Sequence, residues 1–129
     1  MPIFSGKELF KSIEFLWGEI VRNRKAQVYY KGRYAGILKE DEYGGFQFTY
    51  DPLYLVDGYP IAYTIPLSNE TFTWAAFPPF FEGLASEGWL RRVQCKTQQI
   101  DERDSFGLLL ANGRDTVGAV TLFPLENEG

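Results

Sequence analysis

The chain has 129 residues, which suits one domain with a core that needs neither a disulfide nor a structural metal. Its 13 Lys and Arg against 17 Asp and Glu give a net charge of −4, which disfavours direct binding to nucleic acid. It contains one cysteine and no histidine, so an internal disulfide and the usual thiol–imidazole pair are both excluded, and a reducing cytoplasm is the expected location.

An amphipathic helix is predicted over Ser5–Lys25. Ser5 and Glu8 have the spacing of a capping box, in which each side chain satisfies a backbone donor of the first turn. The apolar positions that follow recur with a helical period: Leu9, Phe10, Ile13, Leu16, Trp17, Ile20 and Val21. Acidic residues interrupt this stripe, so neither a signal peptide nor a membrane span is expected. We expect the helix to pack on its own domain, with docking on a partner as the alternative.

From Gln27 the apolar period changes to two, which indicates strands. Four strands are expected in this part of the chain: 28–30, 34–38, 46–50 and 61–65. Lys31-Gly32-Arg33 is the predicted hairpin turn between the first two strands, and Asp51-Pro52 starts a helical turn that ends at Asp57-Gly58. Residues 68–73 are polar and are interpreted as a loop.

The stretch Phe77–Val93 holds the most unusual combination of residues. Two prolines open a short helix that buries Phe80, Phe81 and Leu84, and Gly83 and Gly88 allow the chain to turn. A second helix is expected to begin near Glu87 and to run to about Gln98. Trp89 follows this turn directly. A tryptophan at such a corner is either a core residue or an interface anchor, and the sequence leaves both open.

The C-terminal third is predicted to add one helix and one strand. Asp101–Asp104 is interpreted as a solvated acidic connector, and Ser105 as the cap of a helix that ends at Asn112-Gly113. The last strand is expected over Val117–Phe123, ended by Pro124. Arg114 and Asp115 lie in the loop before it, where Asp115 either closes the loop or takes part in binding.

These elements predict an α+β fold: a small, mostly antiparallel sheet of about five strands, short helices packed on it, and an extra N-terminal helix. The expected organisation is a helix over 1–26, one domain over 27–124 and an acidic tail over 125–129. Catalysis is not expected, because the carboxylates lie mostly in turns and tails. No cofactor or metal is expected either, since no phosphate loop or ligand cluster is recognisable.

Several segments occur in the order found in a known family, the N-terminal subdomain of HipA-type serine/threonine kinases of bacterial toxin–antitoxin systems. The segments that carry this resemblance are 28–38, 46–50, 65–67, 80–84, 87–88 and 113–122. The family often has Leu-Leu-Pro-Glu-Gly where this chain has Leu84-Ala85-Ser86-Glu87-Gly88. The N-terminal helix lies outside the resemblance, and nothing in the family explains it.

The resemblance implies an antitoxin. Family kinases continue into an ATP-binding body, whereas this chain stops at Gly129. It is thus similar to the HipS-like subunit of the split HipBST version, which acts on a HipT-like kinase in a ternary complex with HipB, a helix-turn-helix DNA-binding protein. The alternative is an assembly subunit that supplies a missing subdomain and leaves the kinase active. The residues expected to bind the partner are Trp89, Phe80, Phe81, Glu87, Arg92, Arg114 and Asp115.

Overall fold

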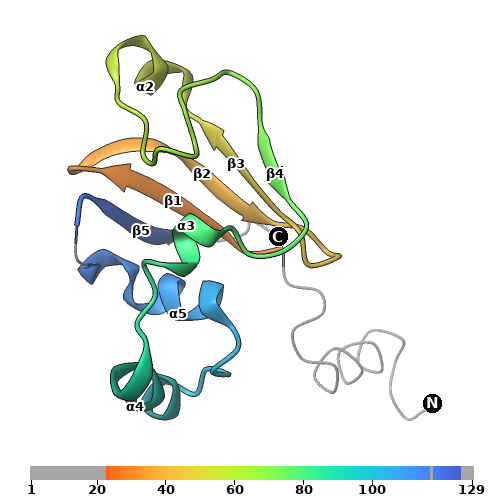
Figure 1. Ribbon diagram of the computed structural model, residues 1–129, viewed down its shortest axis with the longest axis vertical. Helices are drawn as coiled ribbons and strands as arrows, with labels where there is room; N and C mark the ends of the chain where they lie inside the picture. Colours follow the sequence, from red (N-terminus) through yellow and green to blue (C-terminus); the bar gives the residue numbers. More distant parts are fainter. Residues whose placement is uncertain (1–22, 117, 126–129) are drawn as a thin grey trace.

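The computed structural model describes residues 23–116 and 118–125, and five antiparallel strands form its framework (Figure 1). The strands are β1 (Lys25–Tyr30), β2 (Arg33–Glu40), β3 (Phe46–Tyr50), β4 (Phe72–Trp74) and β5 (Val120–Leu125). Their order across the sheet is β4-β3-β2-β1-β5. The last strand therefore lies beside the first one, with Val120 opposite Tyr30.

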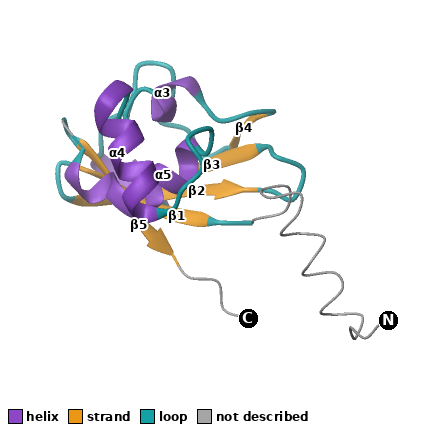
Figure 2. Ribbon diagram, turned by 90° about the horizontal axis from the view of Figure 1, so that it is seen from below, coloured by secondary structure: helices purple, strands orange, loops and turns teal. Residues whose placement is uncertain are grey.

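Short helices complete the α+β fold that the sequence predicts. They are α2 (Pro52–Asp57), α3 (Pro79–Glu82), α4 (Gly88–Gln98), α5 (Ser105–Asn112) and the 3-10 turn η1 (Gly113–Asp115). Figure 2 shows α3, α4 and α5 on the same face of the sheet. The predicted N-terminal helix falls mainly on residues outside the described part of the chain, but its predicted last residue, Lys25, belongs to β1.

The core is built by aromatic side chains that alternate along the strands. In β3, Phe46, Phe48 and Tyr50 are buried, whereas Gln47 and Thr49 point to the opposite face. Burial of such a side chain stabilises the fold by roughly 1.5–3 kcal/mol. The rings of this strand meet partners from the helices, with 5.3 Å between the centroids of Phe46 and Phe106 and 6.2 Å between Phe48 and Phe81. The sheet thereby positions α3 and α5.

The prediction of a fourth strand over residues 61–65 is wrong. This segment forms a turn with a single bridge between Ala62 and Ile65. The hydroxyl of Tyr50 accepts a hydrogen bond from the amide of Ile61 and donates one to the carbonyl of Ile65, so a buried side chain satisfies the backbone groups that a neighbouring strand would otherwise bind.

The strand that pairs with β3 at this edge of the sheet is β4, which lies within and just after the segment that the sequence favoured as a polar loop. Its residues Phe72 and Trp74 are half-buried against the core, while Thr73 between them is exposed. Three residues suffice for this strand because it pairs on one side only, with β3.

The other elements predicted for the described residues are present, but some of their ends differ: β5 covers Val120–Leu125 where a strand over Val117–Phe123 was predicted. The hairpin turns at Lys31-Gly32, both at positive φ, and α5 ends at Gly113 as expected. Pro124 lies inside β5 opposite Ala26, which is tolerated because β5 is an edge strand. The cap of α5 is Asp104 rather than Ser105: its carboxylate accepts a hydrogen bond from the amide of Gly107 at 3.0 Å.

Candidate partner-binding surface

Trp89 is presented to solvent by the turn that precedes α4. Pro79 opens α3, and Gly83 ends it. Gly88 then adopts a φ of +59°, a conformation that costs glycine little but strains other residues. The helix α4 begins at this glycine, so Trp89 lies in its first turn, where 70% of its surface is exposed. Of the two interpretations that the sequence left open, the structure excludes a core position for this ring.

Two further apolar side chains are exposed next to Trp89. Leu90 is 47% exposed and Val93 is 41% exposed. The spacing i, i+1 and i+4 places the three residues on one side of the helix, and we call this set the α4 face. Arg92 and Lys96 are exposed beside it and give it a positively charged border. Neither Leu90 nor Val93 was predicted as a site residue, although their spacing from Trp89 is a visible helical signal.

Arg91 fastens the opposite side of α4 to the rest of the domain. Its Nε and Nη2 donate to the carbonyl of Glu102 at 2.9 and 2.6 Å, and its Nη1 donates to the carbonyl of Ser86 at 3.1 Å. Its Nη2 also lies 2.8 Å from the hydroxyl of Ser105, at the start of α5. These bonds hold α4 in one orientation, and they keep the α4 face turned outward.

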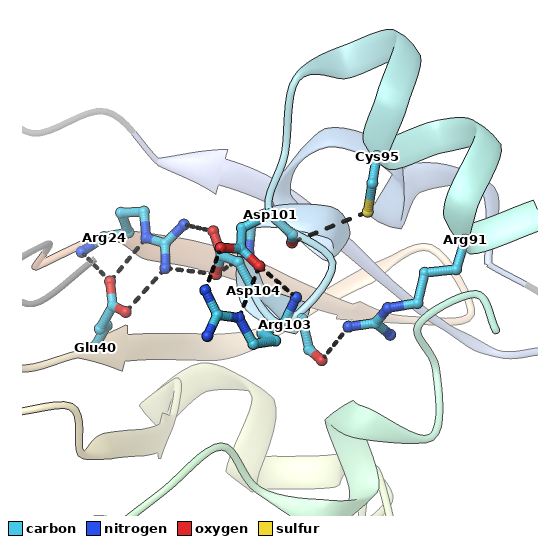
Figure 3. A network of polar contacts seen from close by, with 9 residues as sticks. Arg24, Glu40, Arg91, Cys95, Asp101, Arg103 and Asp104 are labelled. Atoms are coloured by element: carbon cyan, nitrogen blue, oxygen red, sulfur yellow. Dashed lines mark hydrogen bonds and ion pairs between the residues drawn. The ribbon is translucent and has the colours of Figure 1, made fainter. Parts of the chain in front are cut away.

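Cys95 is the buried residue of α4 and points toward the loop at Asp101 (Figure 3). Burial raises the pKa of its thiol, and the nearby charge of Arg91 offsets part of this effect. A buried thiol with a raised pKa is a weak nucleophile. Cys95 therefore anchors the helix through packing.

The two phenylalanines predicted to bind a partner lie in different surroundings. Phe81 is 0% exposed and belongs to the core, so its predicted place on the binding surface is not retained. Phe80 is half-buried, and its ring meets Phe81 edge-on with 5.2 Å between the centroids. The structure thus makes Phe81 the internal support of the α3–α4 corner and leaves part of Phe80 accessible.

The charged candidates are divided between two sides of the molecule. Glu87 and Arg92 are exposed at α4 beside Trp89. Asp115 lies in η1 and lines a groove together with Leu90, so it borders the α4 face. The guanidinium of Arg114 lies 5.7 Å from the ring centroid of Phe123. Phe123 is half-buried in β5, where Val120 and Leu122 are the buried residues. Arg114 is therefore engaged at β5 and does not join the α4 face.

A cluster of charges that the sequence did not reveal ties three distant segments together (Figure 3). Arg24 binds Glu40 through Nε at 2.8 Å and Nη2 at 2.9 Å, and it binds Asp104 through Nη1 at 2.9 Å. Burial alone would lower the pKa of the Arg24 guanidinium, but the hydrogen bonds and charges of the two carboxylates outweigh it and raise the pKa. The interpretation of Asp101–Asp104 as a solvated connector is therefore wrong at Asp104, which is paired and only 15% exposed.

The described residues show neither a metal-binding cluster nor a membrane-spanning helix. Within residues 23–116 and 118–125, no group of three or more His, Cys, Asp or Glu side chains is arranged to hold a metal ion. Over the same residues, none of the helices combines the length and the apolar character that crossing a membrane requires.

Comparison with known proteins places this domain among relatives of different lengths. The family model described as HipA N-terminal domain matches residues 26–123. An uncharacterized protein of Haemophilus influenzae is 38% identical over 104 residues, which are 81% of this chain and 93% of that protein. A protein of Sinorhizobium fredii named putative kinase Y4mE is 31% identical over 107 residues, which are 81% of this chain but only 26% of that protein.

A solved structure described as the N-terminal domain of HipA toxin has the same architecture. Its superposition on this chain has a TM-score of 0.65, with 34% sequence identity. The match covers 81% of this chain and 95% of the other. The described domain therefore corresponds to nearly the whole of that structure.

Proposed function

This chain belongs to the HipA N-terminal domain family, and on that premise we propose that it is a non-catalytic antitoxin that binds and neutralises a HipA-like serine/threonine kinase. The relationship to HipA toxin supports a kinase as the partner. In this proposal the partner is a HipT-like kinase, and the small chain acts by occupying a surface that the kinase needs.

The observation that carries the proposal is the exposed α4 face. Trp89, Leu90 and Val93 lie together on a helix whose other side is fastened to the domain, so their exposure does not result from a loosely attached segment. Clustered apolar side chains with a charged border are typical of protein-binding surfaces, and tryptophan is enriched among the residues that dominate binding energy.

The rigid support of α4 also favours an inhibitor that needs little reorganisation. A helix that is already in place does not have to be ordered on binding, and this preserves affinity. The proposed action is therefore that the corner formed by Phe80–Arg92 covers the active-site region of the kinase, with Trp89 as the anchor and Arg92 and Lys96 facing acidic groups of the partner.

A kinase assay tests this proposal directly. A purified HipT-like kinase is incubated with increasing amounts of this chain, and transfer of phosphate from radiolabelled ATP is measured. We expect activity to fall to background at an equimolar ratio, because a tight inhibitor titrates its target. Full kinase activity in a complex that is shown by size-exclusion chromatography to be complete would contradict neutralisation.

One finding favours an alternative, in which this chain is an assembly subunit of a split kinase. The match to the Sinorhizobium fredii putative kinase covers only 26% of that protein, so the region equivalent to this chain is part of a longer polypeptide there. A subunit of this kind would stabilise the kinase without inhibiting it. In the same assay, unchanged or increased activity on addition of this chain would identify this alternative.

The proposal also includes a DNA-binding partner in a ternary complex. The net charge of −4 leaves this chain little to exchange for the counterions condensed on DNA. We therefore assign DNA binding to a HipB-like helix-turn-helix protein. A mobility-shift assay at physiological salt should show a shifted band only when that protein is present, and a shift by this chain alone would contradict the assignment.

A further inference from the structure

A groove of about 330 Å³ runs beside the α4 face, between α4 on one side and α5 and η1 on the other. Its apolar walls are four leucines: Leu84, Leu90, Leu108 and Leu109. Leu108 and Leu109 belong to the core, so this wall is backed by packed side chains. Leu90 belongs to both the groove and the α4 face. A partner that covers the α4 face would therefore meet the groove as well.

The groove offers two hydrogen-bond acceptors that nothing in the described part of the chain satisfies. Gln94 lines it, and the side-chain oxygen of this residue is buried without a hydrogen-bond partner. Asp115 lies at its border with an exposed side chain, and no ion pair found among the described residues involves it. A buried acceptor without a donor costs free energy, which a ligand that supplies the donor would recover.

The charged residue of the groove is acidic. None of the described residues that line it is a lysine or an arginine, whereas Asp115 contributes a carboxylate. The two nearest arginines along the chain are engaged elsewhere: Arg91 donates to the carbonyl of Glu102, and Arg114 lies over the ring of Phe123. An acidic side chain would bring no donor to these acceptors, and a neutral polar one would bring no positive charge opposite the carboxylate of Asp115.

We propose that this groove receives an arginine side chain of the partner protein, with its aliphatic stem against the leucines and its guanidinium between Asp115 and Gln94. An arginine fits because its planar group carries five N–H donors in fixed directions and can serve two separate acceptors at once. A lysine presents a single strongly hydrated centre and matches this arrangement less well. This inference rests on the proposed function for the identity of the partner as a kinase, but the groove itself is a feature of this chain alone.

The groove is tested first without any kinase. N-acetyl-L-arginine methylamide is titrated into the isotopically labelled full chain, and backbone amide shifts are followed by NMR. We expect weak, saturable changes that cluster at Leu90, Gln94 and Asp115. The matched citrulline compound, which lacks the positive charge, and the Asp115→Asn variant should each abolish saturation. Equal responses to the arginine and citrulline compounds, or changes scattered over the surface, would overturn the proposal.

The second test uses the complex with the kinase. The Asp115→Asn variant should bind about tenfold more weakly, the order expected when one charge-assisted hydrogen bond is lost. The control is Glu70→Gln, which removes one negative charge from an exposed loop residue away from the groove and should leave affinity unchanged. Because Asp115 is exposed, both variants should melt like the wild type.

The outcomes separate the two proposals. If the wild-type chain binds no kinase, the proposed function fails, and the NMR titration still decides whether the groove takes an arginine. If the wild type binds and neutralises the kinase and Asp115→Asn binds equally well, the function stands and the arginine site is overturned.

Discussion

Arg24 and Asp104 are separated by 80 residues in the sequence, yet their side chains form an ion pair with two contacts of 2.9 Å, Nη1 to Oδ2 and Nη2 to Oδ1. The same guanidinium binds Glu40 at the end of β2. Asp104 in turn caps α5. A single arginine at the beginning of the described domain thus connects the sheet to the helix that carries much of the core.

Removing this arginine should destabilise the fold. In Arg24→Ala, Glu40 and Asp104 would both lose this guanidinium, and their side chains are only 7% and 15% exposed. Breaking such a pair should lower the free energy of unfolding by roughly 3 kcal/mol, measured by urea denaturation. The control is Arg33→Ala, because the Arg33–Asp57 pair is exposed and should contribute about 1 kcal/mol or less. Equal losses in the two variants would show that the cluster has no special role.

Trp89→Ala should separate binding from stability. The indole is 70% exposed, so its loss should leave the melting temperature within a few degrees. If it anchors the kinase, its removal should weaken binding by ~2 kcal/mol or more, about thirtyfold, and should restore kinase activity at an equimolar ratio. Calorimetry with the kinase and thermal unfolding of the same preparation provide both measurements.

Tyr63 offers a matched control for Trp89. It is an aromatic residue with 99% exposure, and it lies in the 61–65 turn away from α4. Tyr63→Ala should change neither the melting temperature nor the affinity for the kinase. A loss of affinity in this variant comparable with that of Trp89→Ala would mean that exposure of an aromatic ring, rather than its place on the α4 face, governs binding.

Phe81→Ala should have the opposite effect. The ring is 0% exposed and packs between Phe48 and Phe77, with centroids at 6.2 and 6.5 Å, so its removal leaves a cavity. The expected loss of unfolding free energy is ~3–5 kcal/mol by denaturant titration. Phe80→Ala should cost less, since Phe80 is only half-buried. A Phe81→Ala variant that melts normally but fails to bind the kinase would show instead that Phe81 belongs to the binding surface.

Cys95 should make stability depend on pH in the alkaline range. Burial raises the pKa of its thiol above the ordinary value of 9.0, which it recovers on unfolding. The folded state then favours the neutral thiol. This contribution is fully present below the unfolded pKa and is lost as the pH rises through the folded pKa. The unfolding free energy is measured at pH 8 and at pH 10 for the wild type and for Cys95→Ala. The decrease between the two pH values should be smaller in Cys95→Ala, because the variant has no thiol to ionise. An identical decline in both proteins would contradict the assignment.

Elements with strong local signals follow from the sequence alone. The Lys31-Gly32 turn, the Asp51 cap before Pro52 and the end of α5 at Gly113 all depend on a few neighbouring residues whose backbone preferences act over one turn. The start of α4 at Gly88 belongs to the same class, so the position of Trp89 at a corner follows from the sequence alone.

Burial, pairing and charge contacts depended on segments far apart in the chain. Phe81 and Trp89 lie eight positions apart in one aromatic stretch, but only the packing of β3 against α3 decides that Phe81 is covered and Trp89 is not. Residues 61–65 have the composition of a strand, yet the hydroxyl of Tyr50 satisfies their backbone and leaves the sheet edge to Phe72–Trp74. A hydrogen bond or a buried contact is made in space, so its partner is visible in the sequence only when the two residues are also close along the chain.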